Sequence, residues 1–131
     1  MTVRILCVDD DKDGCEMICV FLQTYNPSFA VTPVRSAKDA LKAIESEKFD
    51  IYIIDGGSQQ LAGLSFCGLV RGWDEDGVIV FLSDNEGDKT DALNSGADIY
   101  LLKPRDIHKI TTVIDDLLDY ERAASVISQR L

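Results

Sequence analysis

The sequence has few basic residues and only one histidine, His108. Its 13 lysines and arginines stand against 23 aspartates and glutamates, which gives a formal net charge of −10. Phosphate backbones are bound through clusters of Lys and Arg, so this composition argues against nucleic-acid binding by the domain. No apolar run approaches the length of a membrane span, and we expect no membrane association. Because an apolar segment already begins at Val3, we also expect no signal peptide.

Cysteines are few and lack the spacing of a zinc site. The four are Cys7, Cys15, Cys19 and Cys67. Zinc sites normally use Cys-x-x-Cys pairs or histidines, and this sequence offers neither pattern around its cysteines. We therefore expect reduced thiols that act as small apolar residues, a usage that fits a cytoplasmic protein.

Apolar segments alternate with helical patterns along the whole chain. Hydrophobic residues make up 46% and charged residues 27% of the sequence, as in a globular domain. Short apolar runs without alternation predict strands that are buried on both faces, hence a parallel sheet between helix layers. The predicted strands are Val3–Val8, Phe29–Val34, Ile51–Ile54, Val78–Leu82 and Ile99–Leu102. The predicted helices are Lys12–Thr24, a segment capped by Ser36, Leu61–Arg71, Asp88–Ser95, and a segment from Arg105 almost to the C-terminus.

The last predicted helix is long for one that only closes a small domain. We place the domain in residues 1–120 and treat residues 121–131 as an extension of this helix. An apolar stripe continues into the extension at Ala123, Ala124, Val126, Ile127 and Leu131. Exposed apolar stripes usually mark interfaces, so we expect the extension to contact a second copy or an attached output domain.

Polar residues follow four of the predicted strands. Asp9, Asp10 and Asp11 come after the first, Asp55 after the third, Ser83 after the fourth and Lys103 after the fifth. In open parallel sheets, ligands bind outside the carboxyl ends of the strands. Carboxylates repel one another unless a cation or a chemical task holds them together. This set of acids, a hydroxyl and an ammonium suits Mg²⁺ and a phosphoryl group.

With these residues in place, the chain resembles a response-regulator receiver domain of two-component signalling over about residues 3–120. The matching positions are Asp9 and Asp10 (acidic pair), Asp55 (phosphoacceptor), Gly63, Ser83 (hydroxyl), Gly96-Ala97-Asp98, Tyr100 (aromatic switch) and Lys103-Pro104. The resemblance implies an α/β, (βα)5 flavodoxin-like fold with strand order 2-1-3-4-5. It further implies a cytoplasmic domain that catalyses its own phosphorylation on Asp55, and its own dephosphorylation, without turnover of another substrate. The donor would be a histidine kinase, a histidine phosphotransfer protein or a small phosphodonor.

The resemblance also assigns a role to each site residue. Mg²⁺ would be held by Asp10, Asp55 and a backbone carbonyl near Gly57, with Asp9 acting through a bound water. Lys103 would neutralise one phosphoryl oxygen, and Ser83 would donate a hydrogen bond to another. The bond between Lys103 and Pro104 is a place where a cis peptide is expected.

Several positions depart from the family pattern. The loop after Asp55 begins Gly56-Gly57, which makes it more flexible. Asp84 follows Ser83 where a small apolar residue is usual, and we expect its charge to oppose phosphorylation unless it turns outward.

Two other functions stay open at this point. One is a receiver-like module that works through protein contacts without phosphorylation. The other is a phosphatase of the haloacid-dehalogenase type, because Asp9–Asp11 contains an Asp-x-Asp after a strand. That enzyme would need a second acidic pair at a strand end, whereas Asp115 and Asp116 fall in a predicted helix.

Overall fold

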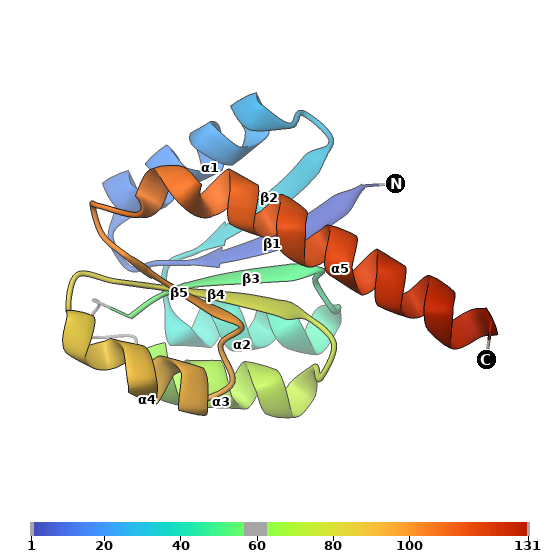
Figure 1. Ribbon diagram of the computed structural model, residues 1–131. Helices are drawn as coiled ribbons and strands as arrows, with labels where there is room; N and C mark the ends of the chain where they lie inside the picture. The colour runs from blue at the N-terminus through green and yellow to red at the C-terminus, as the bar shows by residue number, and fades with distance from the viewer. Residues whose placement is uncertain (1, 57–62, 131) are drawn as a thin grey trace.

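A single parallel sheet forms the centre of the molecule (Figure 1). The computed structural model describes residues 2–56 and 63–130, with the side chains of 121–128 and 130 outside the described part. The strands are β1 (Val3–Val8), β2 (Phe29–Val34), β3 (Ile51–Asp55), β4 (Val78–Ser83) and β5 (Ile99–Leu102). Their order is β2-β1-β3-β4-β5, and every neighbouring pair is parallel. The predicted flavodoxin-like fold and its strand order are confirmed.

Helices cover both faces of this sheet. They are α1 (Lys12–Tyr25), α2 (Ala37–Ser46), α3 (Gly63–Trp73), α4 (Lys89–Asn94) and α5 (Ile110–Arg130), with 3-10 turns at Glu86–Asp88 and Ile107–Lys109. Helices α1 and α5 lie on one face, and α2, α3 and α4 lie on the other (Figure 1). No helix in the described ranges has both the length and the apolar character needed to cross a bilayer.

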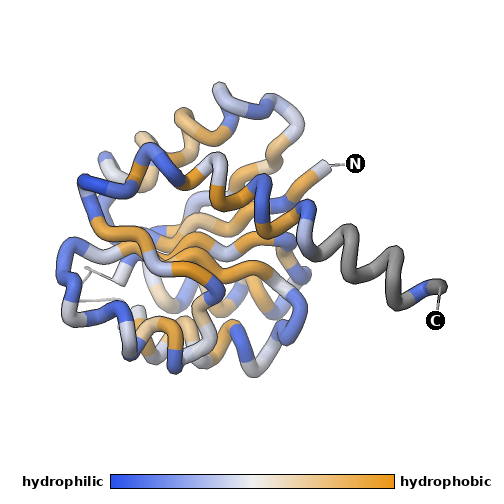
Figure 2. Tube along the Cα trace, viewed as in Figure 1, coloured by the Kyte–Doolittle hydropathy of each residue, from blue (hydrophilic) through white to orange (hydrophobic). Residues whose placement is uncertain are grey.

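The core is divided by the sheet into two apolar clusters. Successive side chains of a strand point to opposite faces, so Leu6 and Ile54 pack toward α2, α3 and α4, while Cys7 and Ile53 pack toward α1 and α5. The strands are apolar nearly throughout, as Figure 2 shows by their colour. This two-sided burial is nearly complete for the central strands β1, β3 and β4, which explains why they read as continuous apolar runs, whereas the edge strands β2 and β5 are more exposed.

Side-chain caps begin the first two helices. The Asp11 carboxylate accepts a hydrogen bond from the backbone N–H of Asp13 at 3.3 Å, which starts α1 directly after β1. The Ser36 hydroxyl accepts one from the N–H of Asp39 at 3.0 Å, so the predicted cap of α2 is confirmed. The cap at Asp11 fixes the acidic segment between β1 and α1 at the edge of the sheet.

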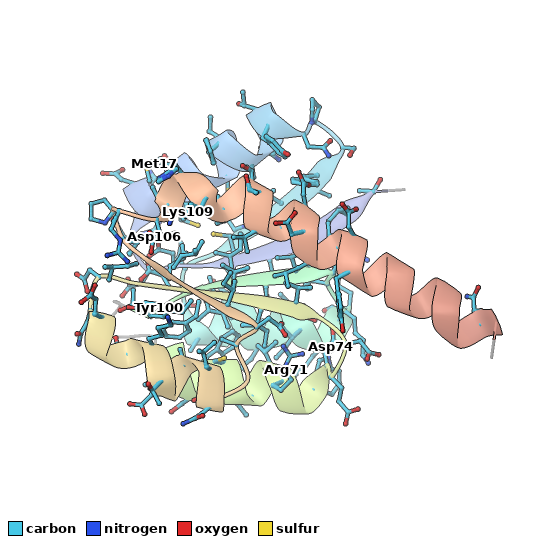
Figure 3. The ribbon with its side chains drawn as sticks, viewed as in Figure 1. Met17, Arg71, Asp74, Tyr100, Asp106 and Lys109 are labelled. Carbon is cyan, nitrogen blue, oxygen red and sulfur yellow. The ribbon has the colours of Figure 1, made fainter. Side chains whose placement is uncertain are left out.

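Arg71, at the end of α3, ties together the opposite end of the sheet, where β4 and β5 begin (Figure 3). Its guanidinium donates hydrogen bonds to the carbonyls of Gly77 at 2.8 Å and Gly96 at 3.0 Å, and pairs with the Asp98 carboxylate at 2.7 Å. Gly96 has φ +114°, a conformation that favours glycine. Asp98 also accepts the N–H of Ile79 at 2.7 Å, which sets β5 against β4.

The last helix begins later than the sequence predicts. The chain forms a 3-10 turn at Ile107–Lys109 before α5 starts at Ile110. The buried Asp106 causes this delay, because its carboxylate accepts the N–H of Leu102 at 3.1 Å while its own N–H donates to the Leu102 carbonyl at 2.7 Å. Hydrogen bonds from Arg105 and from the Leu102 N–H hold the pKa of Asp106 well below its usual range.

Helix α5 then runs to Arg130 and extends beyond the rest of the molecule in Figure 1. The expected contact through the apolar stripe of residues 121–131 stays a prediction, since those side chains fall almost entirely outside the described part.

Candidate functional site

The strand register brings the predicted site residues to one edge of the sheet. Val8 pairs with Ile54, so Asp9 and Asp55 leave neighbouring strands at the same level. Asp55 pairs with Leu82, which places Ser83 one residue beyond it. Ser83 pairs with Leu102, and the N–H of Lys103 donates to the Ser83 carbonyl at 2.7 Å. Four strands thus deliver two acids, a hydroxyl and an ammonium to adjacent positions.

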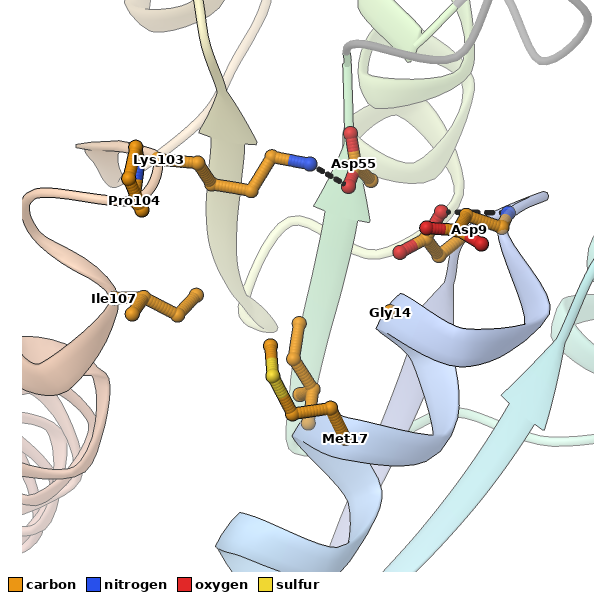
Figure 4. A pocket seen from close by; sticks show the side chains of 9 residues that line it. Asp9, Gly14, Met17, Asp55, Lys103, Pro104 and Ile107 are labelled. Atoms are coloured by element: carbon orange, nitrogen blue, oxygen red, sulfur yellow. Dashed lines mark hydrogen bonds and ion pairs between the residues drawn. The ribbon is translucent and has the colours of Figure 1, made fainter.

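A pocket of about 200 Å³ opens at this edge (Figure 4). Its lining consists of Asp9, Asp11, Gly14, Met17, Ile18, Asp55, Lys103, Pro104 and Ile107. The Lys103 ammonium forms an ion pair with the Asp55 carboxylate, which is itself buried. The peptide bond between Lys103 and Pro104 is cis, as predicted. Asp55 and Lys103 therefore face each other across the pocket, with Asp9 beside them.

Asp9 is the most perturbed carboxyl group in the pocket. Burial raises its pKa to about 6, and the neighbouring Asp55 carboxylate adds to that rise. The backbone N–H of Asp11 donates to Asp9 at 2.9 Å and opposes the rise, as does the charge of Lys103. Three aspartates and one lysine line the pocket, which leaves it with surplus negative charge that a bound cation would neutralise. The donor set therefore fits a hard cation such as Mg²⁺.

The remaining predicted metal ligands lie differently. Asp10 is half-buried and is not among the residues that line the pocket. Gly57 lies outside the described residues, so the carbonyl ligand expected there stays a prediction. Gly63 begins α3, and a Cβ atom at this position would lie 2.7 Å from the Cα of Gly56. The glycine expected there thus allows α3 to pack directly against the chain that leaves Asp55.

The Ser83 side chain is fully buried and already has two hydrogen-bond partners. Its hydroxyl donates to the Asp88 carboxylate at 2.8 Å and accepts the N–H of Asn85 at 3.0 Å. Asp84, the acid that the sequence singles out, is exposed and does not line the pocket. The carboxylate that engages Ser83 is therefore Asp88, five residues along the chain.

Tyr100 is connected to the same loop. Its hydroxyl donates to the carbonyl of Asn85, whose N–H contacts Ser83. Its ring stacks on Phe81 with the centroids 6.3 Å apart. Tyr100, the predicted switch residue, and Ser83, the predicted hydroxyl residue, are therefore connected through the backbone of a single residue, Asn85.

Sequence reasoning misses three contributors to the site. Asp88 lies in a polar stretch that gives no signal of its contact with Ser83. Asp106 directly precedes a helix, so its position is typical of an N-cap residue. Its carboxylate does not cap the helix but accepts the N–H of Leu102, and this contact holds the turn after Lys103. Met17 lines the pocket although more than half of its surface is exposed, because it comes from the second turn of α1.

Comparison with known proteins gives a consistent result. The sequence model of the response regulator receiver domain family matches residues 5–115. The chain is similar to the regulatory protein VanR of Enterococcus faecium, with 30% identity over 131 residues that cover 98% of this chain and 56% of VanR. The chain spans about half the length of VanR and of similar curated relatives.

Solved structures show the same fold. The response regulator TrrA of Thermotoga maritima, in complex with Mg²⁺ and beryllofluoride, is similar with a TM-score of 0.79 and 25% identity, over 88% of this chain and 99% of that one. A receiver domain protein of Methanospirillum hungatei reaches a TM-score of 0.85 over 95% of this chain and 99% of its own, and at 22% identity it supports the fold alone.

The raised pKa of Asp9 predicts a specific pH dependence of stability. A folded-state pKa of about 6 against the usual 3.8 means that the folded chain binds more protons in this window, so stability falls as the pH rises through it. In metal-free buffer, we expect Asp9→Asn to be more stable than the parent by about 1–2 kcal/mol near pH 7 after allowance for solvent screening, with the difference vanishing near pH 4.

Urea unfolding at both pH values with a chelator present measures this difference. Asp84→Asn, which changes an exposed carboxylate, serves as the control and should unfold like the parent. An Asp9→Asn variant that is no more stable than the parent near pH 7 would show that the burial of this carboxyl costs nothing.

Proposed function

Because the chain belongs to the response regulator receiver domain family of two-component systems, we propose that it accepts a phosphoryl group on Asp55 in a Mg²⁺-dependent reaction. The observation that supports this most is the pairing of a buried Asp55 with Lys103 at the pocket, beside a second acid. The expected setting is the cytoplasm, which is typical of response regulators.

The proposed chemistry is a phosphoryl transfer from a phosphohistidine. A carboxylate oxygen of Asp55 forms the new bond to phosphorus while the bond from phosphorus to the imidazole nitrogen breaks, and the nitrogen keeps the electron pair. Lys103 leaves the Asp55 carboxylate and pairs with a phosphoryl oxygen. Ser83 donates its hydroxyl proton in a hydrogen bond to another. Hydrolysis of the aspartyl phosphate by water later restores Asp55.

The acidic residues at the end of β1 would hold the metal. Receiver domains bind Mg²⁺ generally, and one structural neighbour was solved with Mg²⁺ and beryllofluoride. We propose Asp10 and Asp55 as direct ligands and Asp9 as a ligand through water, as the resemblance implies. When bound, Mg²⁺ would neutralise charge on the phosphoryl oxygens. Burial raises the pKa of Asp9, so its charge is unfavourable in the metal-free pocket and would be stabilised by a bound cation.

Phosphorylation requires Ser83 to exchange partners. Its hydroxyl proton now points to the Asp88 carboxylate, and hydrogen bonds to charged groups contribute about 1.5–3 kcal/mol. A phosphoryl oxygen must compete with this contact. We therefore expect Asp88 to oppose phosphorylation. From the sequence alone, this effect is expected of Asp84, the acid next to Ser83.

The phosphodonor protein would bind beside the pocket, on α1. This helix exposes Met17, Val20 and Phe21, and Met17 also lines the pocket that contains Asp55. Apolar side chains at this density on a surface usually mark an interface. We propose that the partner is a histidine kinase or phosphotransfer protein, whose apolar helix face would cover these residues. His108 is exposed and lines a pocket together with Met17 and Phe21 of α1. The proposal does not use it as the phosphodonor, because the partner supplies the phosphohistidine.

The alternatives receive less support. Asp115 and Asp116 lie in α5, away from the strand ends, so the second acidic pair of a haloacid-dehalogenase-type phosphatase has no counterpart there. A protein-interaction module without phosphorylation stays possible only if Asp55 accepts no phosphoryl group from any donor.

We expect acetyl phosphate with Mg²⁺ to add one phosphoryl group to the chain, on Asp55. Asp55→Asn should abolish the mass increase, because the nucleophilic carboxylate is gone. Lys103→Ala should fold normally and lower the phosphorylated fraction about tenfold or more, since a phosphoryl oxygen that lacks its ammonium partner raises the barrier to transfer.

Lys89→Ala, which removes an exposed lysine, is the control for this reaction. Mass spectrometry that places the group on another residue would overturn the proposal, and failure of every donor would favour the interaction module.

Asp88→Ala should bind beryllofluoride, a phosphoryl mimic, more tightly than the parent in the presence of Mg²⁺. We expect the affinity for beryllofluoride to rise about 3–10-fold, because in the variant the Ser83 hydroxyl need not give up a hydrogen bond to a carboxylate before it binds the mimic. Asp84→Ala is the matched control and should change the affinity by less than about twofold. Equal affinities in the parent and Asp88→Ala, measured by titration calorimetry, would show that the contact between Ser83 and Asp88 does not oppose binding.

Phe21→Ser should slow phosphotransfer from a phosphorylated histidine kinase by about tenfold, because it removes an apolar anchor from the docking face. Phosphorylation by acetyl phosphate should be unchanged, since Phe21 does not line the pocket. Leu69→Ser, which alters an exposed leucine on α3, should affect neither reaction. A kinase reaction as fast in Phe21→Ser as in the parent would place the docking face elsewhere.

A further inference from the structure

Three of the four cysteines gather between β1 and α1. The Sγ atoms of Cys7, Cys15 and Cys19 all lie within 4.8 Å of one another. Cys7 and Cys15 are only 1% exposed, whereas Cys19 is half-buried and gives the group a route to solvent. None of the three is in a disulfide. The sequence gives little sign of this cluster, because Cys7 comes from a strand and the other two from a helix.

The packing of α1 on the sheet creates the cluster. Cys15 and Cys19 are four residues apart and so lie on one face of the helix, one turn from each other. Cys7 points to the same side of the sheet, and all three belong to or pack against the apolar cluster under α1 and α5. The Cys15 thiol lies 4.0 Å from the Cys7 carbonyl, which shows how closely the helix approaches the strand here.

We propose that these three thiols form a binding site for a single soft d¹⁰ metal ion of the Cu(I) class. Thiolates bind such metals at about 2.3 Å, and three of them around one ion lie about 4 Å from each other. The observed spacing, with all three Sγ atoms within 4.8 Å of one another, is close to this arrangement. Each thiol that binds the ion releases its proton to solvent.

The composition of the site favours Cu(I) over zinc. Sulfur-only sites select soft ions, and Cu(I) is among the metals that thiolates prefer. Structural zinc is almost always four-coordinate, whereas the group found here has three ligands and apolar surroundings that include Ile18 and Leu22.

The electrostatics of the cluster agree with a metal-binding role. A hydrogen bond from the Cys7 thiol, with a further one from Cys15, lowers the pKa of Cys19 to about 7 against the opposing effect of burial. Cys19, the most accessible of the three thiols, thus has a pKa below the usual value for a cysteine. An incoming ion would meet this sulfur first.

Packing alone is the simpler explanation, and the chain offers an internal control for it. Cys67 is fully buried in the other apolar cluster, under α3, and does not belong to the group of three. If the cysteines serve only as small apolar residues, replacing any of them affects stability but gives no metal-dependent result. The proposal makes a different prediction for Cys67 than for the three clustered residues, and it does not depend on phosphorylation of Asp55.

The test is a competition for Cu(I) between the reduced full chain and the colorimetric chelator bicinchoninate, under anaerobic conditions. We expect the parent to withdraw one Cu(I) per chain. Cys19→Ala and Cys15→Ala should weaken binding by about tenfold or more, and Cys67→Ala should bind like the parent within about twofold. Circular dichroism checks that each variant is folded, and the half-buried position of Cys19 makes its variant the safest.

Three results would overturn the proposal. The parent could fail to withdraw Cu(I) from the chelator. The Cys67→Ala variant could lose binding as strongly as Cys19→Ala, which would mean that the cluster is not the site. The chain could bind Zn(II) but not Cu(I) through these cysteines, which would contradict three-coordinate binding of a soft ion.

Discussion

The site depends on holding two carboxylates side by side where water is scarce. Asp9 and Asp55 are both 3% exposed, and one ammonium, that of Lys103, faces them. The sheet register imposes this arrangement, because β1 and β3 end at the same level and the end of β5 brings Lys103 opposite. The raised pKa of Asp9 is the electrostatic consequence. Such an arrangement costs free energy in the metal-free chain, and the proposed cation and phosphoryl group would offset that cost.

The loop after β4 links the site to the molecular surface. Ser83 contacts Asp88 and Asn85, and the carbonyl of Asn85 accepts the Tyr100 hydroxyl. A phosphoryl group that captures the Ser83 hydroxyl would break one of these contacts and change what the loop presents to Tyr100. Two alternative sets of hydrogen bonds are what a two-state signalling element needs. The arrangement described here is the one in which Asp88 holds Ser83.

Much of this architecture is predictable because its causes are local. Two-sided burial makes the central strands apolar runs, and polar residues at the ends of four strands lie at the site, as Asp55 and Lys103 do. The contact between Ser83 and Asp88 could not be predicted, because it depends on the path of a short 3-10 turn. The clustered cysteines were missed for a similar reason, since their proximity comes from the packing of α1 on β1. Gly57 lies outside the described residues, and its predicted role stays a prediction.

The central claim is that loading of Asp55 redirects the Ser83 hydroxyl, and amide NMR tests it most directly. The Asn85 N–H donates to Ser83, while the Ile79 N–H is bound to Asp98 at the far end of the sheet. On titration with beryllofluoride and Mg²⁺, the Asn85 resonance should shift to saturation while that of Ile79 changes little. Asp55→Asn should abolish the Asn85 shift. An Asn85 resonance that stays in place in the loaded parent chain, or shifts equally in Asp55→Asn, would contradict the account.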